Sequence, residues 1–415
     1  MLQDASQTIL DRHRPVQLSV TTDDCDQSLS LTRGSALSSP SPPLTPHAED
    51  KSLENSQQTQ SEHRSSLLSI TPVDSNTPKK PTTFPDQALE FPEDLEFCHD
   101  PTGRRVEFGR GAWSIVYKAT SCKPKDTPLI TPPSSPASGS RVLAVKSPFR
   151  RDGHPILHAE AQVLTRLNRE PGSDSHIVPF HGYITSSNSI VMSAIPLSLS
   201  THIEDRAIIA KNQMSTKTMF DPILGMESWQ DLATKLISGL SWLHNKALIV
   251  HGDIKPHNIL LRPWSNVDEE SSRFPHEPLF ADFSSSHDLS RPAADRKTAM
   301  TAFTPPFTAP ELLLLPSITS PDITPLPASD IFSLAITLLT AATGDLLLYP
   351  GSNNMQRLAM AREGHRALEF IRSGSNACRV LRNGTVEQVV KPAITKDPTQ
   401  RVAADEWLHV VRNIG

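Results

Sequence analysis

The segment from Val250 to Leu261 constrains this chain more than any other, because it places three different functional groups within six positions. A carboxylate (Asp253), an ammonium (Lys255) and an amide (Asn258) lie in a polar stretch that separates an amphipathic helical pattern from an apolar strand pattern. In such a loop the carboxylate can accept a proton, the ammonium can neutralise negative charge, and the amide oxygen can bind a divalent cation. The sequence therefore predicts a reactive loop that needs a folded scaffold around it.

The first 90 residues cannot supply that scaffold. They contain 15 Ser, 10 Thr and 9 Pro but one aromatic residue, Phe84, so they bury too little apolar surface to offset the entropy of ordering. We predict a disordered tail at 1–90 and a folded domain at 91–415. Five Ser/Thr-Pro steps in the tail fit phosphorylation by proline-directed kinases as a partner class, or a solvated spacer. The sequence leaves both interpretations open.

Charge and cysteine usage exclude several classes of protein. The 415 residues carry 40 basic and 45 acidic side chains, a formal charge of −5, so we expect neither nucleic acid nor a membrane as a partner. The cysteines are far apart and form no CxxC pair, which argues against a zinc knuckle or a disulfide framework and for a reducing compartment. These are Cys25, Cys98, Cys122 and Cys378.

Localisation follows from two further patterns. The N-terminal residues lack the basic stretch and apolar run of a secretory signal, so the cytoplasm or the nucleus is expected. The apolar window at 331–348 approaches the length of a membrane span, but Gly344 and Asp345 interrupt it. A buried helix is the favoured interpretation.

Hydrophobic periodicity predicts an α+β architecture with two lobes. Short β-branched or aromatic runs predict strands at 105–108, 114–119, 142–146, 177–183 and 189–194. Helical spacing of apolar residues predicts helices at 156–167, 229–243, 330–343 and 403–411. A patch rich in Pro and Ser at 123–140 interrupts the strands and predicts a disordered surface insert. The chain should therefore form a small β-rich lobe with one helix, followed by a larger, mainly helical lobe.

Two features between the strands suit the binding of phosphates. Gly109 and Gly111 lie between two predicted strands, where they allow a tight turn that brings backbone N–H groups close to phosphate oxygens, although such a turn is also common in ordinary hairpins. Lys146 ends an apolar strand, and Glu160 follows on the predicted helix. A lysine at a strand end is usually an edge residue, but a carboxylate that holds its ammonium makes a good clamp for a triphosphate.

Acidic and basic residues further along the chain complete the pattern. Asp282 ends an apolar strand, where a carboxylate can take a hard cation that bridges phosphates. Glu311 and Arg401 would each be unremarkable surface charges on their own.

In this order the motifs resemble the eukaryotic protein kinase family, Ser/Thr branch, over roughly residues 91–415. The resemblance implies a bilobal kinase fold with an N-lobe at about 91–195 and a C-lobe at about 196–415. It also implies ATP and Mg²⁺ as cofactors and proteins as substrates. It implies a lid over ATP from Gly109, Gly111 and Val116, and a nucleotide site that includes Ala144, Met192 and Ile195.

The same resemblance implies the catalytic roles. Lys146, paired with Glu160, would contact the phosphates, and Asp253 would be the catalytic base with Lys255 beside it. Asn258 and Asp282 would hold Mg²⁺. Three further roles are implied: Thr304 in the substrate-binding loop, Asp330 as a brace of the catalytic loop, and Glu311 with Arg401 as a buried ion pair.

Three positions depart from the family pattern. Ser114 replaces the third glycine of the lid, Gly252 replaces the arginine before Asp253, and Ser284 replaces the glycine after Phe283. The missing arginine would read a phosphate on the activation segment, so its loss implies activity without such phosphorylation. The five side chains that the family needs for phosphoryl transfer are all present, which favours an active Ser/Thr protein kinase. They are Lys146, Glu160, Asp253, Asn258 and Asp282. A scaffold-like pseudokinase is the alternative, and a small-molecule kinase is disfavoured by the segment at 309–311.

Overall fold

The computed structural model describes residues 87–122, 141–264, 273–290, 303–314 and 324–414. All of these residues belong to one compact unit. The predicted insert at 123–140 and nearly all of the predicted tail lie outside the described residues.

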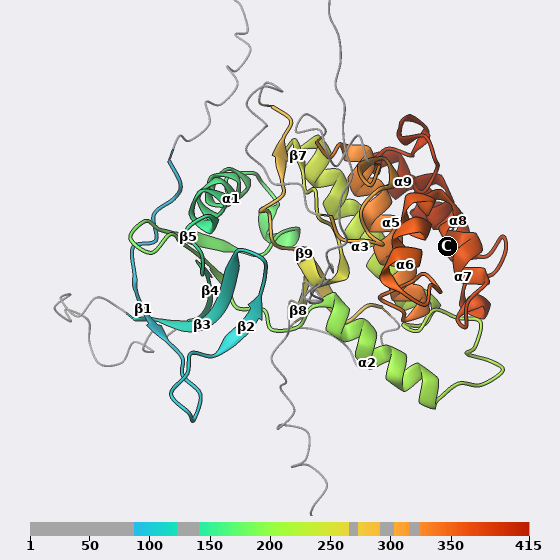
Figure 1. Cartoon of the computed structure of the whole chain (residues 1–415), viewed down its shortest axis with the longest axis horizontal. Coiled ribbons are helices and arrows are strands. Elements are labelled where there is room, and N and C mark those ends of the chain that lie inside the picture. The colour runs from blue at the N-terminus through green and yellow to red at the C-terminus, as the bar shows by residue number, and fades with distance from the viewer. Residues whose placement is uncertain (1–86, 123–140, 265–272, 291–302, 315–323, 415) are drawn as a thin grey trace, which may run out of the picture. The chain divides into compact units, whose positions relative to one another are not determined.

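The first lobe is built on one antiparallel sheet, to which α1 (Gly153–Leu167) is packed (Figure 1). The strand order is β1-β3-β4-β6-β5, with β2 also paired to β3. The bounds are β1 Asp94–Phe97, β2 Glu107–Arg110, β3 Ser114–Cys122, β4 Val142–Pro148, β5 Phe180–Ile184 and β6 Ser189–Ser193. The predicted strands at 114–119, 142–146 and 189–194 match observed strands closely, and the helix predicted at 156–167 is present with an earlier start.

The register of the sheet puts the predicted nucleotide positions on one face. Residues directly opposite in an antiparallel pair point to the same side, as do residues two apart on a strand. Val116 is opposite Lys146, and Ala144, two residues before Lys146, is opposite Met192. These four side chains therefore emerge from the same face of the sheet, although they come from three strands.

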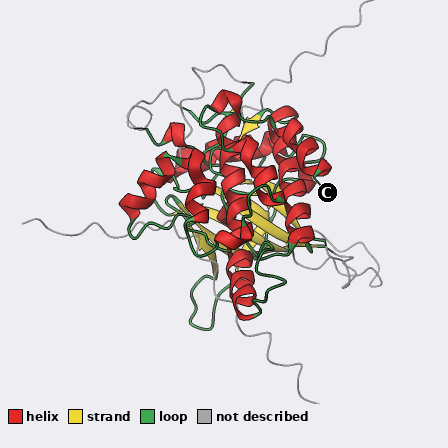
Figure 2. Ribbon diagram, turned by 90° about the vertical axis from the view of Figure 1, so that its right-hand side faces the viewer, coloured by secondary structure: helices red, strands yellow, loops and turns green. Residues whose placement is uncertain are grey.

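The second lobe is mainly helical, as predicted, and in Figure 2 most of its helices lie in front of the strands. Its helices are α2 Leu199–Asn212, α3 Met226–Asn245, α5 Pro327–Thr343, α6 Asn354–Arg362, α7 Ala367–Arg372, α8 Thr385–Val390 and α9 Ala404–Asn413. Its short strands are β7 Ile249–Val250, β8 Ile259–Pro263, β9 His276–Phe280 and β10 His287–Asp288, paired as β8 with β9 and β7 with β10. The α+β class predicted from periodicity is confirmed.

Helix α5 is buried over nearly its whole length, although it carries several hydroxyl side chains. The Ser329 hydroxyl donates to Oε1 of Glu311 at 3.2 Å, and each later hydroxyl donates to a backbone carbonyl three or four residues earlier in the helix, as when Thr337 donates to Ser333 and Thr343 to Leu339, both at 2.9 Å. A buried hydroxyl with such a partner avoids the cost of an unpaired polar group. Among the described residues, no helix combines the length and the apolarity that crossing a membrane requires.

A pair of histidines, His202 in α2 and His276 in β9, predicts a pH dependence of stability. His202 packs edge-on against Phe274 and lies 5.4 Å, between ring centroids, from His276. Burial, with the nearby His276 and Arg206, lowers the pKa of His202 to about 4. In the unfolded chain His202 therefore binds a proton below about pH 6.5, whereas in the folded chain it binds one only below about pH 4.

The free energy of unfolding should consequently fall by roughly 2 kcal/mol on this account as the pH drops from about 7 to about 4, after allowance for partial solvent screening. Urea titrations across this range should show a weaker loss for His202→Gln than for the wild-type protein. His409→Gln, on the exposed side of α9, is the matched control. An equal loss in wild type and His202→Gln would contradict the prediction.

Candidate active site

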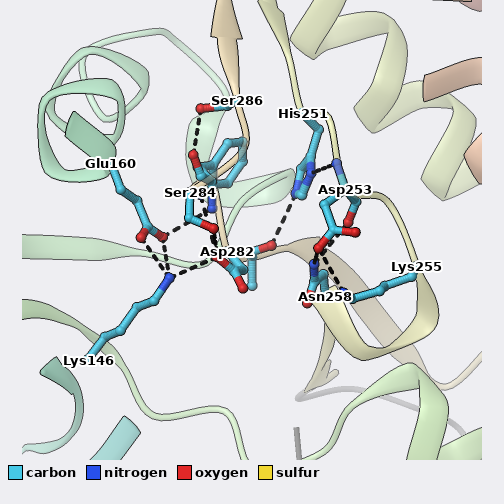
Figure 3. Close-up of polar contacts among 11 residues, drawn as sticks. Lys146, Glu160, His251, Asp253, Lys255, Asn258, Asp282, Ser284 and Ser286 are labelled. Carbon is cyan, nitrogen blue, oxygen red and sulfur yellow. Dashed lines mark hydrogen bonds and ion pairs between the residues drawn. The ribbon is translucent and has the colours of Figure 1, made fainter. Parts of the chain in front are cut away.

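Two carboxylates, from Glu160 and Asp282, meet at the ammonium of Lys146 (Figure 3). The Lys146 ammonium lies 2.6 Å from Oε2 and 2.8 Å from Oε1 of Glu160, and 2.8 Å from Oδ1 of Asp282. Glu160 comes from α1, whereas Asp282 follows β9 in the other lobe. One lysine therefore ties a strand, a helix and the second lobe together.

Burial decides what these groups can do. The side chains of Lys146 and Glu160 are 7% and 1% exposed, whereas that of Asp282 is 36% exposed. Burial acts to lower the pKa of Lys146, but the carboxylates of Asp282 and Glu160 outweigh it and raise that pKa above its ordinary value. Burial acts to raise the pKa of Asp282, but Lys146 and the Ser284 hydroxyl outweigh it and hold that pKa below its usual range. Lys146 is thus a fixed cation, and Asp282 is an ionised carboxylate that a ligand can reach.

The backbone after Asp282 contributes to the same arrangement. The Phe283 N–H donates to Oε1 of Glu160 at 3.1 Å, and the Ser284 hydroxyl donates to Oδ1 of Asp282 at 2.7 Å. Asp282 itself has a positive φ of 63°, a conformation that non-glycine residues adopt only when their surroundings hold them in it. The Ser284 hydroxyl is a positioning contact that the sequence alone did not indicate.

The predicted catalytic loop forms a second cluster. Asp253 Oδ2 lies 2.8 Å from the Lys255 ammonium and accepts from Nδ2 of Asn258 at 2.9 Å. Thr304 completes the cluster, since its hydroxyl lies 3.3 Å from Oδ1 of Asp253 and 3.2 Å from Lys255. Burial raises the pKa of Asp253, while Lys255 opposes this shift. A base, an ammonium and a hydroxyl are therefore held within hydrogen-bond reach of one another.

Asp330, at the start of α5, holds the loop from below. Its Oδ2 accepts from the His251 N–H at 2.7 Å and its Oδ1 from the Gly252 N–H at 2.9 Å, while His244 Nε2 lies 3.0 Å from Oδ2. The Asp330 side chain is 1% exposed, so these bonds satisfy a carboxylate that would otherwise be costly to bury. The brace predicted for Asp330 is present in the structure.

The two clusters are joined through Ala281. Its carbonyl lies 3.1 Å from Nε2 of His251, and its N–H donates to the Asn258 carbonyl at 2.9 Å. These bonds fix the distance between the loop that carries Asp253 and the strand end that carries Asp282 (Figure 3). The five side chains singled out from the sequence are thus brought into one region.

Glycine at position 252 has a steric cause in this structure. Its φ is +79°, and a Cβ added there would lie 2.3 Å from the carbonyl oxygen of Ser285. The sequence analysis treated Gly252 as a lost arginine. The structure adds that the catalytic loop and the segment after Asp282 approach so closely that only glycine fits without a shift.

The ion pair expected between Glu311 and Arg401 is also formed. Two parallel bonds of 2.8 and 2.7 Å join the guanidinium to the carboxylate, and Arg401 donates a further bond to the Ala328 carbonyl at 2.9 Å. The Arg401 side chain is fully buried. Breaking a buried pair of this kind leaves an uncompensated charge, so the pair serves stability in the helical lobe.

The donors near Asp282 suit a hard divalent cation. Asn258 is buried and uses its Nδ2 for Asp253, which leaves its amide oxygen outside these two bonds, and the Asp282 carboxylate is partly exposed. No cluster of three or more His, Cys, Asp or Glu side chains within the described residues could hold a metal on its own. Mg²⁺ commonly binds through one or two protein oxygens together with substrate phosphates, so these two residues fit that cation.

The chain belongs to the protein kinase family, because the model of the protein kinase domain matches residues 138–411. The matched region includes Lys146, Glu160, Asp253, Asn258 and Asp282, whereas the glycine turn at 109–111 precedes it. The recognition made from the motifs is confirmed, and the two lobes form the protein kinase fold. The family implies ATP and a divalent metal in general terms.

Curated relatives of this chain are kinases of modest similarity. It is 26% identical over 304 residues to the serine/threonine-protein kinase PknK of Mycobacterium tuberculosis (strain CDC 1551 / Oshkosh), covering 72% of this chain and 22% of PknK. It is 28% identical over 207 residues to mitogen-activated protein kinase kinase 3 of Arabidopsis thaliana, which covers 49% of this chain and 33% of that kinase. It is 35% identical over 221 residues to the dual specificity mitogen-activated protein kinase kinase jkk-1 of Caenorhabditis elegans, which covers 51% of this chain and 41% of jkk-1. The chain therefore spans less than half the length of each of these relatives.

The contact between Gly252 and Ser285 predicts different costs for two chemically identical substitutions. Gly103 has the same φ of +79°, but nothing lies within 4 Å of an added Cβ there. Gly103→Ala should therefore cost only backbone strain, about 1 kcal/mol, whereas Gly252→Ala should cost roughly 3 kcal/mol because two backbones must also separate. Chemical denaturation of both variants measures the difference. Equal losses would show that the close approach has no energetic weight.

Proposed function

We propose that this protein is an active serine/threonine protein kinase that transfers the γ-phosphoryl group of MgATP to hydroxyls of protein substrates. The observation that supports this most is the convergence of Lys146, Glu160 and Asp282 from three separate elements, within reach of the loop that carries Asp253. The Ser/Thr branch is favoured by Lys255 and Thr304, which both contact Asp253. The relatives named as Ser/Thr or dual-specificity kinases support the same class.

In this proposal the sheet supplies the nucleotide site. Gly109 lies in β2, and Gly111 begins the turn to β3, in which the Gly111 N–H donates to the Ser114 carbonyl at 2.8 Å. Val116, Ala144 and Met192 offer an apolar surface for the adenine ring on the face that carries Lys146, and Ile195 follows β6. Lys146, held by Glu160, binds phosphate oxygens through its fixed charge.

The catalytic loop would act on the attacking hydroxyl. Asp253 accepts the proton of the attacking hydroxyl. Burial raises the pKa of this carboxyl, which makes its carboxylate a stronger proton acceptor. Lys255 neutralises charge on the transferred group, while Thr304 orients both side chains. Asn258 and Asp282 would hold Mg²⁺, which supplies charge neutralisation at the phosphates when bound. The protein contributes mostly position and electrostatics.

Replacing the base tests the proposed chemistry. Asp253→Asn keeps the size of the side chain but removes the proton acceptor, so phosphotransfer should fall by about 10²- to 10⁴-fold while ATP binding persists. The assay follows radiolabel from ATP into a generic basic protein, with nucleotide affinity measured separately. Asp405→Asn, on the exposed start of α9, controls for the change in net charge. Full activity of Asp253→Asn would refute the role of Asp253.

A pseudokinase that acts as a scaffold is the second candidate, and one observation favours it. Asp282 Oδ1 is bound by both Lys146 and Ser284, so the protein's own donors occupy an oxygen that a cation could use. The altered residues Gly252 and Ser284 point in the same direction.

Purified wild-type protein distinguishes the two candidates. An active kinase should incorporate label from ATP into itself or into added proteins with Mg²⁺ or Mn²⁺, and Lys146→Met should abolish this because the phosphates lose their fixed cation. Lys211→Met, at an exposed position near the end of α2, is the control for a lost surface cation. Absence of incorporation with either metal would favour the scaffold.

Partners and compartment remain part of the proposal. Protein substrates follow from the kinase class, and proline-directed kinases are candidate partners for the Ser/Thr-Pro steps of residues 1–86. The wide spacing of the cysteines, with no CxxC pair, supports a reducing compartment, the cytoplasm or the nucleus. The proposed domain division places the tail at 1–90 and the kinase domain at 91–415, although residues 88–90 at the end of this tail contact the domain.

A further inference from the structure

A short segment before β1 adds to the open edge of the sheet. Strand β5 is the last strand of the sheet order, so one of its sides would otherwise present unpaired backbone groups. Glu90 forms a parallel bridge with Tyr183 there. The Tyr183 N–H donates to the Leu89 carbonyl at 2.7 Å, and the Phe91 N–H donates to the Tyr183 carbonyl at 3.0 Å. We call residues 88–91 the strap.

Side chains and one glycine adapt the domain to the strap. Ala88 is 7% exposed and belongs to the main hydrophobic core, and the Thr185 hydroxyl donates to the Glu90 carboxylate. Gly182, in β5, has a φ of +148°, and a Cβ there would lie 2.8 Å from both N and Cα of Phe91. The strap is therefore seated in a space that the domain keeps open by using glycine.

The strap also reaches α1, the helix that carries Glu160. The Leu89 N–H donates to the Thr165 hydroxyl at 2.9 Å, and this hydroxyl donates in turn to the Ala161 carbonyl at 2.7 Å. Thr165 is 2% exposed, so the acceptor end of the bond is buried. It lies five residues from Glu160, about 7.5 Å along the helix axis.

The next residue fixes the same turn of α1 from the other lobe. Arg166 donates to the Ala247 carbonyl at 2.5 Å and pairs with Asp288 of β10. The last turn of α1 is thus bound by the strap on one side and by the C-terminal lobe on the other. Freeing one side would leave this turn held by the other side alone.

We propose that the strap is a positioning element for the nucleotide site: by pairing with β5 and binding Thr165, it holds α1 where Glu160 meets Lys146. The inference rests on the proposed function for its kinetic consequence, but the coupling of the strap to α1 is independent of it. Thr165 and Gly182 are its positioning residues, and neither contacts Lys146 in the part of the chain that the structure describes.

The test compares substitutions in the full-length protein. Thr165→Val removes the acceptor for Leu89 with little change in size, and Gly182→Ala obstructs the strap at a different point. Thr165→Ser keeps the hydroxyl and should restore wild-type behaviour. Thr234→Val in α3 is the matched control, because Thr234 makes the same bond to the carbonyl one turn earlier, at 2.8 Å.

Two readouts separate positioning from mere packing. Hydrogen exchange should accelerate about tenfold in peptides covering both 87–91 and 153–167, with peptides of α3 as the internal reference. The KM for ATP should rise by about three- to tenfold in Thr165→Val and Gly182→Ala, with a smaller change in kcat, because the Lys146–Glu160 pair forms less often.

Faster exchange in the strap without a change in α1, or with an unchanged KM, would overturn the inference. The same holds if Thr165→Ser behaves like Thr165→Val. If the wild-type protein transfers no phosphoryl group, the proposed function fails, and the affinity for a non-hydrolysable ATP analogue replaces KM. Exchange in α1 then still decides on the strap.

Discussion

The ammonium of Lys146 connects the two lobes of this protein electrostatically at the candidate active site, apart from the Arg166–Asp288 ion pair that joins them at the end of α1. A buried lysine is tolerated only because two carboxylates lie within hydrogen-bond distance of it. Glu160 belongs to α1, and Asp282 belongs to the end of β9, so the pairing sets the position of a helix and of the second lobe at once. The same charge that holds the lobes together is the charge that a triphosphate would meet. Stability and the proposed catalysis thus depend on one contact.

The catalytic loop is supported in a different way, by backbone bonds to a buried carboxylate. Asp330 accepts from two consecutive N–H groups, which fixes the loop before any substrate is present. The adjacent Gly252 lets the loop approach the segment that follows Asp282. Gly252, which replaces the arginine of the family pattern, is therefore the residue that the local geometry requires. This explains how a close, rigid arrangement can persist without an arginine at this position.

A short segment that flanks the first lobe contacts both its sheet and its helix. The strap lies on an edge strand, where backbone groups need partners, and one of its bonds ends on the helix that carries Glu160. The structure thereby extends the set of residues that position the site beyond those that touch it. Residues 88–90, which composition places in the tail, contact the domain directly.

Local sequence was sufficient for the class of fold and for the identity of the main site residues. Periodicity of two and of 3.6 residues depends on which face is buried, so β4, α1, α3 and α5 could be predicted, and short-range spacing singled out Asp253, Lys255 and Asn258. It could not reveal the Ser284 hydroxyl on Asp282, the contact of Gly252 with Ser285, or the bond from Leu89 to Thr165. Each of these depends on a dihedral angle or on the approach of two segments that only packing determines. The sequence by itself determined which groups are available for phosphate chemistry. Only the tertiary structure decided how they face one another, because distances between remote segments are set by the core that forms around them.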